Sequence, residues 1–368
     1  MKINNIELQN IRNYKTQQVF FKDGLNVLVG NNAQGKTNLL ESIFLCAIGK
    51  SIRTTRIQDL IRWGCTFGKI TLELNKNEGT KKIEFYIFQN QDKSVKINGF
   101  SIKKISELLS EFNAVYFSPD DLKLVKESPM ERRRYMDICL SQVNRNYFFA
   151  LNKYNKILAQ RNKLLKTPQN KETIAQTIEI WNEELATCGA YVINERLKLI
   201  STLKNFVSKI QNFITDEKET IELSYAGEVG ISIDAIRENL IKKYKENIEK
   251  DIQLGYTTIG PHRDDIKILL NSIDVRNFGS QGQQRTCALT LKLAELEYFK
   301  ETLGEYPVLL LDDVLSELDD SRKNKLLEYV SNIQTIITCT NFDFDIPATK
   351  FVISNGEITD IEESKNWY

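Results

Sequence analysis

The stretch that most constrains the fold of this chain runs from Leu25 to Ile43, with the sequence LNVLVGNNAQGKTNLLESI. An apolar run near its start predicts a buried strand, and the apolar residues at its end recur at helical spacing. Between them, Gly30 to Thr37 match the pattern G-x-x-x-x-G-K-[ST]. The pattern can occur by chance in an ordinary turn, but a strand before it and a helix after it are the context that a phosphate-binding loop requires.

This loop predicts that the chain binds a nucleotide. Glycine lets the backbone curl so that successive N–H groups point at phosphate oxygens, and the following helix adds free N–H groups and partial positive charge. We expect Lys36 to reach the β- and γ-phosphates and take part in catalysis, and the Thr37 hydroxyl to ligate Mg²⁺. The loop residues expected to contact the cofactor are Gly30, Asn31, Asn32, Ala33, Gln34, Gly35, Lys36, Thr37 and Asn38.

A second part of the site is predicted in the run PVLLLDDVLSELD, from Pro307 to Asp319. Four apolar residues predict a buried parallel strand, which ends in two carboxylates. Asp312 suits Mg²⁺ coordination beside a phosphate loop, and Asp313 can then orient or deprotonate a water that attacks the γ-phosphate. Acidic residues at a strand end can also form a simple turn, but the phosphate loop upstream favours the metal site.

Two further features are weaker signals. In FGSQGQQR, residues 278–285, Ser280 and Gly282 precede a predicted helix whose N-terminus can bind a second phosphate surface. His262 is the one histidine of the sequence. Because it has no cysteine or histidine partner, we expect a structural role for it and not metal binding.

Composition limits the class of protein. At 368 residues the chain suggests about two domains. Fifty basic residues face 49 acidic ones, so the net charge of +1 favours no partner and any nucleic acid must use a local basic surface. Six cysteines without a C-x-x-C pair predict buried thiols in a reducing compartment. The sequence has no apolar run of about 20 residues, and MKINNIELQN lacks the apolar core of a signal peptide, so we expect a cytoplasmic protein.

The middle of the chain changes character. Before it, Ile70, Leu72 and Leu74 alternate with polar residues and predict a half-buried strand. From residue 118 to 250 helical periodicity dominates, and apolar residues step by four and three from Ile174 to Val192. We predict a helical lobe at 118–250 with a hairpin tip at Thr167–Asn170, and a second domain made of residues 1–117 and 251–368. Lysine-rich residues near the tip are either a solvated face or a nucleic-acid contact; they are Lys153, Lys156, Arg161, Lys163 and Lys166.

Together these motifs resemble the ABC-type ATPases and, among them, the SMC-like group. GNNAQGKT resembles their nucleotide loop, GSQGQ at 279–283 their signature motif, LLLDD their second nucleotide motif and SELD at 316–319 their D-loop. The short helical arm, with FSPDDL at 117–122, GPHRDD at 260–265 and SQGQQR at 280–285, is similar to the RecF family of recombination-repair proteins. The resemblance implies an α/β fold, an ABC-type head with a mixed sheet, a phosphate loop and flanking helices, and an inserted helical arm.

The resemblance also implies a mechanism. ATP and Mg²⁺ would be the cofactors, and two chains would pair head to tail with each ATP between one chain's loop and the other's signature. Ser280, Gly282 and Gln283 would contact the γ-phosphate in trans, Asp319 would cross the dimer interface, and Arg53 would lie near the nucleotide. The RecF resemblance further implies a slow ATPase that binds gapped DNA or junctions of single and double strand and works with RecO and RecR to load RecA.

The sequence departs from the usual ABC pattern at four places. Asp313 replaces the usual glutamate, which favours slow turnover. Thr340 or Asn341 stands where a switch histidine is expected, and the signature begins with Gly279 and not with leucine. The region of the Q-loop holds the acid pair at 120–121. Two other classes stay open as alternatives. The helical arm and the missing switch histidine argue against the nucleotide-binding subunit of an ABC transporter, and a small-molecule kinase would leave the signature and D-loop unexplained.

Overall fold

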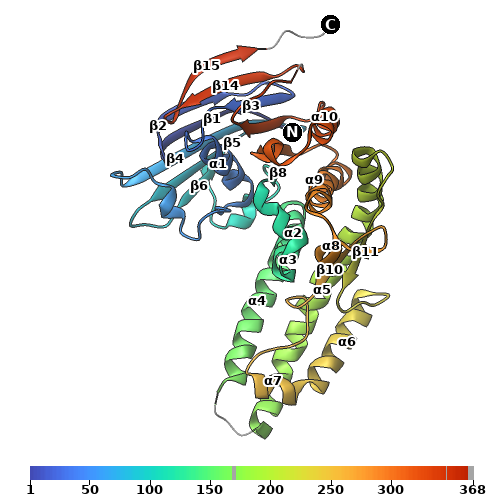
Figure 1. Cartoon of the computed structure of the whole chain (residues 1–368). Coiled ribbons are helices and arrows are strands. Elements are labelled where there is room, and N and C mark those ends of the chain that lie inside the picture. Colours follow the sequence, from blue (N-terminus) through green and yellow to red (C-terminus); the bar gives the residue numbers. More distant parts are fainter. Residues whose placement is uncertain (168–170, 345, 364–368) are drawn as a thin grey trace. The chain divides into compact units, whose positions relative to one another are not determined.

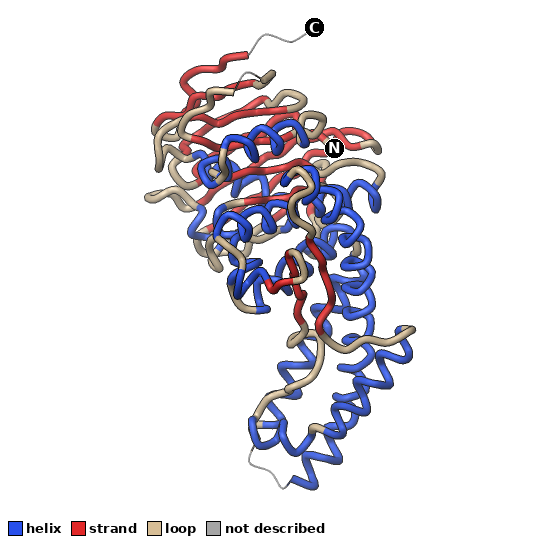
Figure 2. The backbone as a smooth tube through the Cα atoms, turned by 45° about the vertical axis from the view of Figure 1, so that its right-hand side comes forward, coloured by secondary structure: helices blue, strands red, loops and turns tan. Residues whose placement is uncertain are grey.

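A computed structural model describes residues 1–167, 171–344 and 346–363, and only the backbone of residues 171–176. The chain forms two compact units, which we call the head and the arm. The head contains Met1–Leu122, Ile210–Lys218 and Gln281–Tyr368, and the arm contains Lys123–Lys209 and Glu219–Ser280. Most strands belong to the head and most helices to the arm (Figure 2). Among the described residues, no helix is long and apolar enough to cross a membrane.

One sheet of the head carries the phosphate loop (Figure 1). Its strands, in spatial order, are β15 (Glu357–Glu363), β14 (Thr349–Ser354), β3 (Leu25–Val29), β13 (Thr335–Cys339), β12 (Val308–Asp312) and β8 (Ala114–Phe117). Neighbours from β14 to β8 pair in parallel, and β15 pairs antiparallel with β14. Strand β12 is buried along its whole length, as its apolar run predicts. The carboxyl ends of β3, β13 and β12 therefore meet at one edge.

The second sheet of the head is antiparallel. Its strands, in spatial order, are β2 (Tyr14–Phe20), β1 (Lys2–Ile11), β4 (Phe67–Lys76), β5 (Gly79–Phe88), β6 (Ser94–Ile97) and β7 (Phe100–Ser101). Ile70, Leu72 and Leu74 are buried on one face of β4, which confirms the predicted alternation. Helix α1 (Lys36–Ile48) packs against both sheets, and this explains why almost all of its residues are buried.

The other helical elements of the head are short except for one. They are η1 (Ile57–Leu60), η2 (Ile105–Glu107), η3 (Pro119–Leu122), η4 (Val314–Glu317), α9 (Gln281–Leu303) and α10 (Asp320–Tyr329). The long helix α9 packs against β8 and η3. Its side chains are buried on most sides in the middle of the helix, from Gln284 to Leu296.

The arm is built on two long helices (Figure 1). Its helices are α2 (Lys123–Lys126), α3 (Pro129–Val143), α4 (Arg145–Leu165), α5 (Lys171–Thr215, whose last residues lie in the head), α6 (Ile233–Glu246), α7 (Ile248–Leu254) and α8 (Val275–Phe278). Its strands, in spatial order, are β11 (Ile273–Asp274), β10 (Asp265–Leu270) and β9 (Ile221–Ala226). Ile178, Leu185 and Val192 of the predicted stripe are buried. Residues 168–170 of the predicted hairpin tip, and the side chain of Ile174, lie outside the described residues.

The unit boundaries differ from those that the sequence suggests. Residues 251–280 group with the arm and not with the head, because β10 pairs along its length with β9. Residues 210–218 group with the head, where Thr290 donates to Gln211 (2.7 Å) and the Lys325 ammonium to the Phe213 carbonyl (2.7 Å). The predicted functional division stays a prediction. It assigns residues 1–117 and 251–368 to the ATPase head and residues 118–250 to the helical arm.

Arg161 does not belong to the surface of the lysine-rich segment. It is fully buried and pairs with the equally buried Asp251 at 2.8 Å. Asn182 and Thr257 accept its remaining hydrogen bonds at 2.9 and 2.7 Å. Arg161 is therefore a structural residue of the arm, and the alternative that it contacts nucleic acid is wrong.

The motif GPHRDD is partly buried in the arm: Asp264 is buried and His262 is half-buried, whereas Arg263 is exposed. His262 donates from Nε2 to the Thr257 carbonyl (3.0 Å) and accepts at Nδ1 from the Tyr154 hydroxyl (2.6 Å), which fixes the neutral tautomer. Burial lowers the pKa of His262 to about 4. Burial raises the pKa of Asp264 to about 6, against the hydrogen bond from Tyr225. His262 is thus structural, as its isolation in the sequence suggests.

These two residues should give opposite pH dependences of stability. Between about pH 4 and 6 the folded arm keeps a proton on Asp264 that the unfolded chain, with its ordinary pKa of 3.8, releases, so this residue makes the free energy of unfolding fall as pH rises. Between pH 4 and 6.5, His262 is protonated in the unfolded chain but neutral in the folded arm. This residue therefore makes the free energy of unfolding rise with pH.

We therefore expect the free energy of unfolding of Asp264→Asn to rise more steeply with pH than that of wild type. For His262→Gln we expect it to rise less steeply or to fall with pH. Urea denaturation at pH 4.5, 5.5 and 6.5 measures both slopes. Parallel profiles for the two variants would contradict the assigned protonation states, whatever their overall loss of stability.

Candidate functional site

The phosphate loop connects β3 to α1, and two of its glycines are sterically required. Gly35 caps α1 with φ of 113°, and a Cβ there would lie 2.5 Å from the Asn13 amide nitrogen. At Gly30 a Cβ would lie 2.3 Å from the Ile353 carbonyl oxygen of β14. Residues 31–33 between them are exposed, so their backbone is open to a ligand.

The loop is braced from outside by segments distant in sequence. The Asn13 side chain donates to the Gln34 carbonyl (2.9 Å), and the Gly356 N–H donates to the same oxygen (3.0 Å). The Tyr14 hydroxyl donates to the Gly35 carbonyl (3.1 Å). Asn13 also accepts at Oδ1 from the Asn38 amide (2.9 Å). These bonds tie the carbonyls of Gln34 and Gly35 to residues outside the loop and so fix the backbone whose N–H groups are expected to bind an anion.

The Lys36 ammonium is folded into the loop. It donates to the carbonyls of Gly30 and, at 2.9 Å, of Asn31. Desolvation lowers the pKa of Lys36, while the charges of Asp313 and Asp312 raise it. Lys36 is therefore held within the loop by its carbonyls, and its contact with a phosphate stays a prediction.

Asp312 is the centre of the site. Its Oδ1 accepts from the Thr37 hydroxyl (2.9 Å) and from the Thr338 hydroxyl of β13 (2.7 Å), and its Oδ2 accepts from the Tyr116 hydroxyl of β8 (2.7 Å). A hydroxyl and a carboxylate side by side are oxygen ligands that suit Mg²⁺. In the described part of the chain, no group of three His, Cys, Asp or Glu side chains could hold a metal. The pair Thr37–Asp312 thus fits an ion that takes its other ligands from phosphates and water.

Asp313 follows in a left-handed conformation, with φ of 54°. Its N–H donates to the Thr338 hydroxyl (2.9 Å), and its carbonyl accepts from the Ser316 hydroxyl (2.7 Å). Partial desolvation raises the pKa of Asp313, and the charge of Asp312 adds to this. A raised pKa brings the carboxylate closer to what a general base needs.

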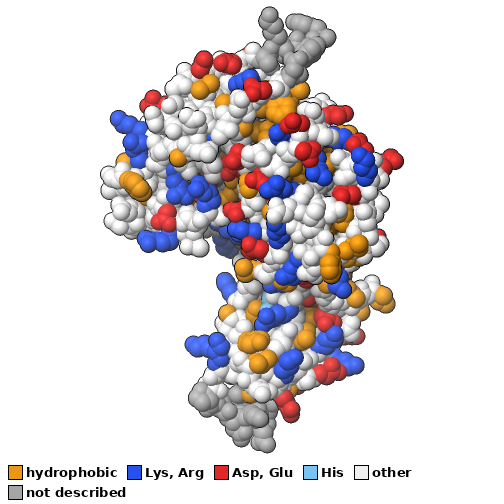
Figure 3. Space-filling view, viewed as in Figure 1, with side chains coloured by type: hydrophobic (Ala, Val, Ile, Leu, Met, Phe, Trp, Pro, Cys, Tyr) orange, Lys and Arg blue, Asp and Glu red, His pale blue; other side chains and the backbone are white. Residues whose placement is uncertain are grey.

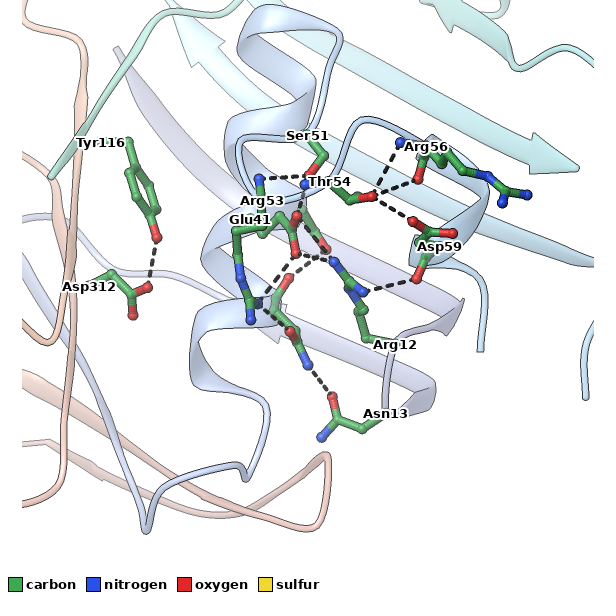
Figure 4. A network of polar contacts seen from close by, with 12 residues as sticks. Arg12, Asn13, Glu41, Ser51, Arg53, Thr54, Arg56, Asp59, Tyr116 and Asp312 are labelled. Carbon is green, nitrogen blue, oxygen red and sulfur yellow. Dashed lines mark hydrogen bonds and ion pairs between the residues drawn. The ribbon is translucent and has the colours of Figure 1, made fainter. Parts of the chain in front are cut away.

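Arg53 belongs to a network of polar contacts around Glu41 of α1 (Figure 4). Its guanidinium donates to Asn38 (3.0 Å) and lies 3.6 Å from the Glu41 carboxylate. Glu41 is buried and also binds the Arg12 guanidinium (3.1 Å) and the Ser51 hydroxyl. The network therefore fixes Arg53 to the helix that begins at Lys36.

The signature and D-loop residues have local contacts. Gly282 and Gln283 lie in the first turn of α9, and Ser280 directly precedes it at the end of the arm unit. The Thr286 hydroxyl donates to the Gly282 carbonyl (2.9 Å). Asp319 caps α10, accepting from the Arg322 N–H (3.0 Å) and pairing with its guanidinium (2.8 Å), and this lowers the pKa of Asp319.

The sequence did not identify Tyr116, Thr338, Asn13 and Glu41 as parts of this site. Tyr116 and Thr338 could have been found, because they lie near the ends of two short β-prone runs of the sequence, AVYF at 114–117 and TIITC at 335–339. Asn341, a candidate sensor of the γ-phosphate, donates to the Asp343 carboxylate, and the neighbouring Thr340 is exposed. Asp121, in the region of the Q-loop, accepts from the Ser118 N–H at 2.9 Å.

Comparisons with known proteins decide the family. The family model "RecF/RecN/SMC N terminal domain" matches residues 2–352. Proteins named DNA replication and repair protein RecF from Clostridium beijerinckii and Clostridium novyi are each 45% identical over 363 residues, which are 97% of this chain and 98% and 99% of theirs. The chain belongs to the RecF family.

Solved structures agree with this assignment. The structure of the recombination mediator protein RecF-ATPrS in the RecFOR pathway is similar with a TM-score of 0.89 and 39% identity, over 98% of this chain and 97% of that one. An SMC head bound to the C-winged helix domain of ScpA has a TM-score of 0.59 at 17% identity, over 99% of this chain and 98% of that one. That likeness concerns the fold alone and supports the SMC-type α/β head that the RecF resemblance implies.

The close approach of Gly30 to β14 gives a stability prediction. In Gly30→Ala the new methyl group must push the Ile353 backbone away, so we expect the free energy of unfolding to fall by about 1–3 kcal/mol. Urea denaturation measures the loss. Ser354→Ala, at the exposed end of β14, is the control and should be close to wild type. Equal free energies of unfolding for Gly30→Ala and wild type would contradict this prediction and show that β14 can shift to make room for the methyl group without loss of stability.

Proposed function

We propose that this chain is an ATP-dependent DNA-binding protein of recombinational repair. In this proposal ATP drives head-to-tail dimerisation, the dimer clamps gapped DNA or a junction of single and double strand, and slow hydrolysis releases it. The observation that carries the proposal is the Thr37–Asp312 contact, which joins the phosphate loop to the second nucleotide motif at 2.9 Å. Membership of the RecF family supplies the biological role.

The residues around Asp312 would divide the chemistry among them. The loop N–H groups and Lys36 would bind the phosphates, and Thr37 and Asp312 would hold Mg²⁺, which would supply positive charge to the site. Tyr116 and Thr338 orient Asp312 through its two oxygens. Asp313 orients the attacking water and accepts its proton. Aspartate is one methylene shorter than glutamate, which favours slow turnover.

The second half of each ATP site would come from another copy of the chain. Ser280, Gly282 and Gln283 would contact the γ-phosphate in trans, with Asp319 at the interface and Arg53 beside the nucleotide of its own chain. Support comes from the resemblance of GSQGQ and SELD to the signature motif and D-loop, together with their places at the starts of helices: Gly282 lies in the first turn of α9 and Asp319 caps α10.

DNA, RecO and RecR are the proposed partners, and RecA loading is the proposed outcome. A solved relative is described as RecF-ATP in the RecFOR pathway, with 38% identity, over 99% of this chain and 98% of that one, and a TM-score of 0.88. Basic and acidic side chains are interspersed over the face in view (Figure 3), so DNA would use a local site. We propose a cytoplasmic, nucleoid-associated protein. The transporter-subunit and kinase hypotheses gain no support from these relatives.

Trapping the ATP state tests the clamp. In Asp313→Asn the amide cannot take a proton from water, so we expect ATP to persist and a labelled gapped duplex to bind at least tenfold more tightly with ATP than without it, at one fixed salt concentration. Fluorescence anisotropy measures the affinity. Lys36→Ala, which should not bind ATP, is the control. Equal DNA affinity with and without ATP, while ATP itself is bound, would remove the clamp.

A bulky charge in the signature tests the trans contact. We expect Ser280→Arg to abolish ATP-dependent dimerisation, seen by analytical ultracentrifugation, while ATP binding persists because the phosphate loop is unchanged. Ser201→Arg, exposed on α5, is the matched control and should dimerise. A Ser280→Arg protein that still dimerises with ATP would contradict the model.

A further inference from the structure

A turn of the head presents a fully exposed tryptophan. Trp63 is 98% exposed, although tryptophan is on average highly buried in folded proteins. The next residue, Gly64, has φ of 81°, and a Cβ there would meet nothing within 4 Å. The indole therefore projects from a turn that packs against nothing on this side.

This turn is anchored firmly despite its exposure. The Arg62 N–H donates to the Asn10 carbonyl (2.9 Å), and the Cys65 N–H closes the turn on the Arg62 carbonyl (3.0 Å). Just before it, Ile61 forms a bridge with Ile11 of β1 and is buried. Since the backbone is held on both sides of Trp63, its side chain is presented in advance for a ligand, which reduces the entropic cost of binding.

The turn ends a basic segment. Residues 50–62, KSIRTTRIQDLIR, hold one acidic residue, Asp59, and four basic residues, which are Lys50, Arg53, Arg56 and Arg62. Asp59 is itself engaged, since its carboxylate accepts from the Thr54 hydroxyl at 2.6 Å. The Arg56 side chain is exposed and extends away from the network around Glu41 (Figure 4). Arg56 and Trp63 are both exposed and lie seven residues apart in the chain, and a guanidinium and an aromatic ring together suit a ligand that combines flat rings with negative charge.

The same turn touches the support of the phosphate loop. The Arg62 guanidinium donates to the Asn13 carbonyl (2.6 Å). Asn13 in turn braces the loop at Gln34 (2.9 Å) and the helix after it at Asn38 (2.9 Å). A ligand on Trp63 would thus bind next to Arg62, the residue that contacts Asn13 and through it the phosphate loop.

We propose that Trp63 is a stacking contact for an unpaired base of single-stranded DNA, with Arg56 contributing to the attraction of its phosphates. This inference rests on the proposed DNA-binding function and names the part of the DNA that the head reads. Bases of any sequence stack on an aromatic face, so the contact distinguishes single strand from duplex and not one sequence from another. In duplex DNA the base faces are already stacked and unavailable to Trp63.

The fluorescence of Trp63 tests this directly. In the full chain carrying Trp181→Phe and Trp367→Phe, Trp63 is the remaining tryptophan. Titration with an oligothymidylate and ATP should quench its emission with saturation, and a blunt duplex should quench it much less. Emission that changes with ATP alone, before DNA is added, would assign Trp63 to contact with a second copy of the chain and overturn the proposal.

Affinities of variants give the second readout. We expect Trp63→Ala to weaken binding of the oligothymidylate and of gapped duplex about tenfold, with blunt-duplex affinity unchanged, and Trp63→Phe to retain most of the affinity. Phe100→Ala is the matched control, because Phe100 is 79% exposed in the same unit. Wild-type affinity of Trp63→Ala for single strand overturns this inference and leaves the proposed function standing. A wild-type protein that binds no DNA with ATP overturns the proposed function as well.

Discussion

The head depends on the carboxylate of Asp312 and the three hydroxyls that donate to it. Thr37 comes from the start of α1, Thr338 from the end of β13 and Tyr116 from β8, and all reach it within 2.9 Å. A buried carboxylate is unfavourable unless donors surround it, so this group ties three segments of very different sequence position to one point. One of these donors, the Thr37 hydroxyl, is also the proposed Mg²⁺ ligand beside Asp312, so the proposed function places a structural and a chemical demand on the same carboxylate.

The sequence predicts well whatever depends on local pattern. The phosphate loop, the apolar run before Asp312 and the alternation at Ile70, Leu72 and Leu74 each determine their own element, because burial on two faces or on one leaves a distinct periodicity. The joining of Thr37 to Asp312 could also be inferred, since parallel strands place their carboxyl ends at one edge. At this point the sequence motifs and the parallel strand order both indicate that Thr37 and Asp312 lie close together.

Other features could not be predicted because long-range pairing decides them. Arg161 looks like a surface cation beside four lysines until Asp251, 90 residues later, is found against it. Residues 251–280 look like head sequence until β10 pairs with β9. Asn13 carries no motif, yet it braces the phosphate loop. In each case the neighbouring sequence contains no pattern that predicts the role of the side chain or strand. The role depends on a partner that is distant in the chain.

The position of β3 has a consequence for synthesis on the ribosome. Its two neighbours in the sheet are β13 and β14, which begin at residues 335 and 349, and the loop after it is braced by Gly356. Chains emerge N-terminus first, so the segment that carries the phosphate loop leaves the ribosome early and waits for almost the entire protein before it can be paired. A message cut short before codon 335 therefore yields a product in which β3 lacks both of the strands that pair with it.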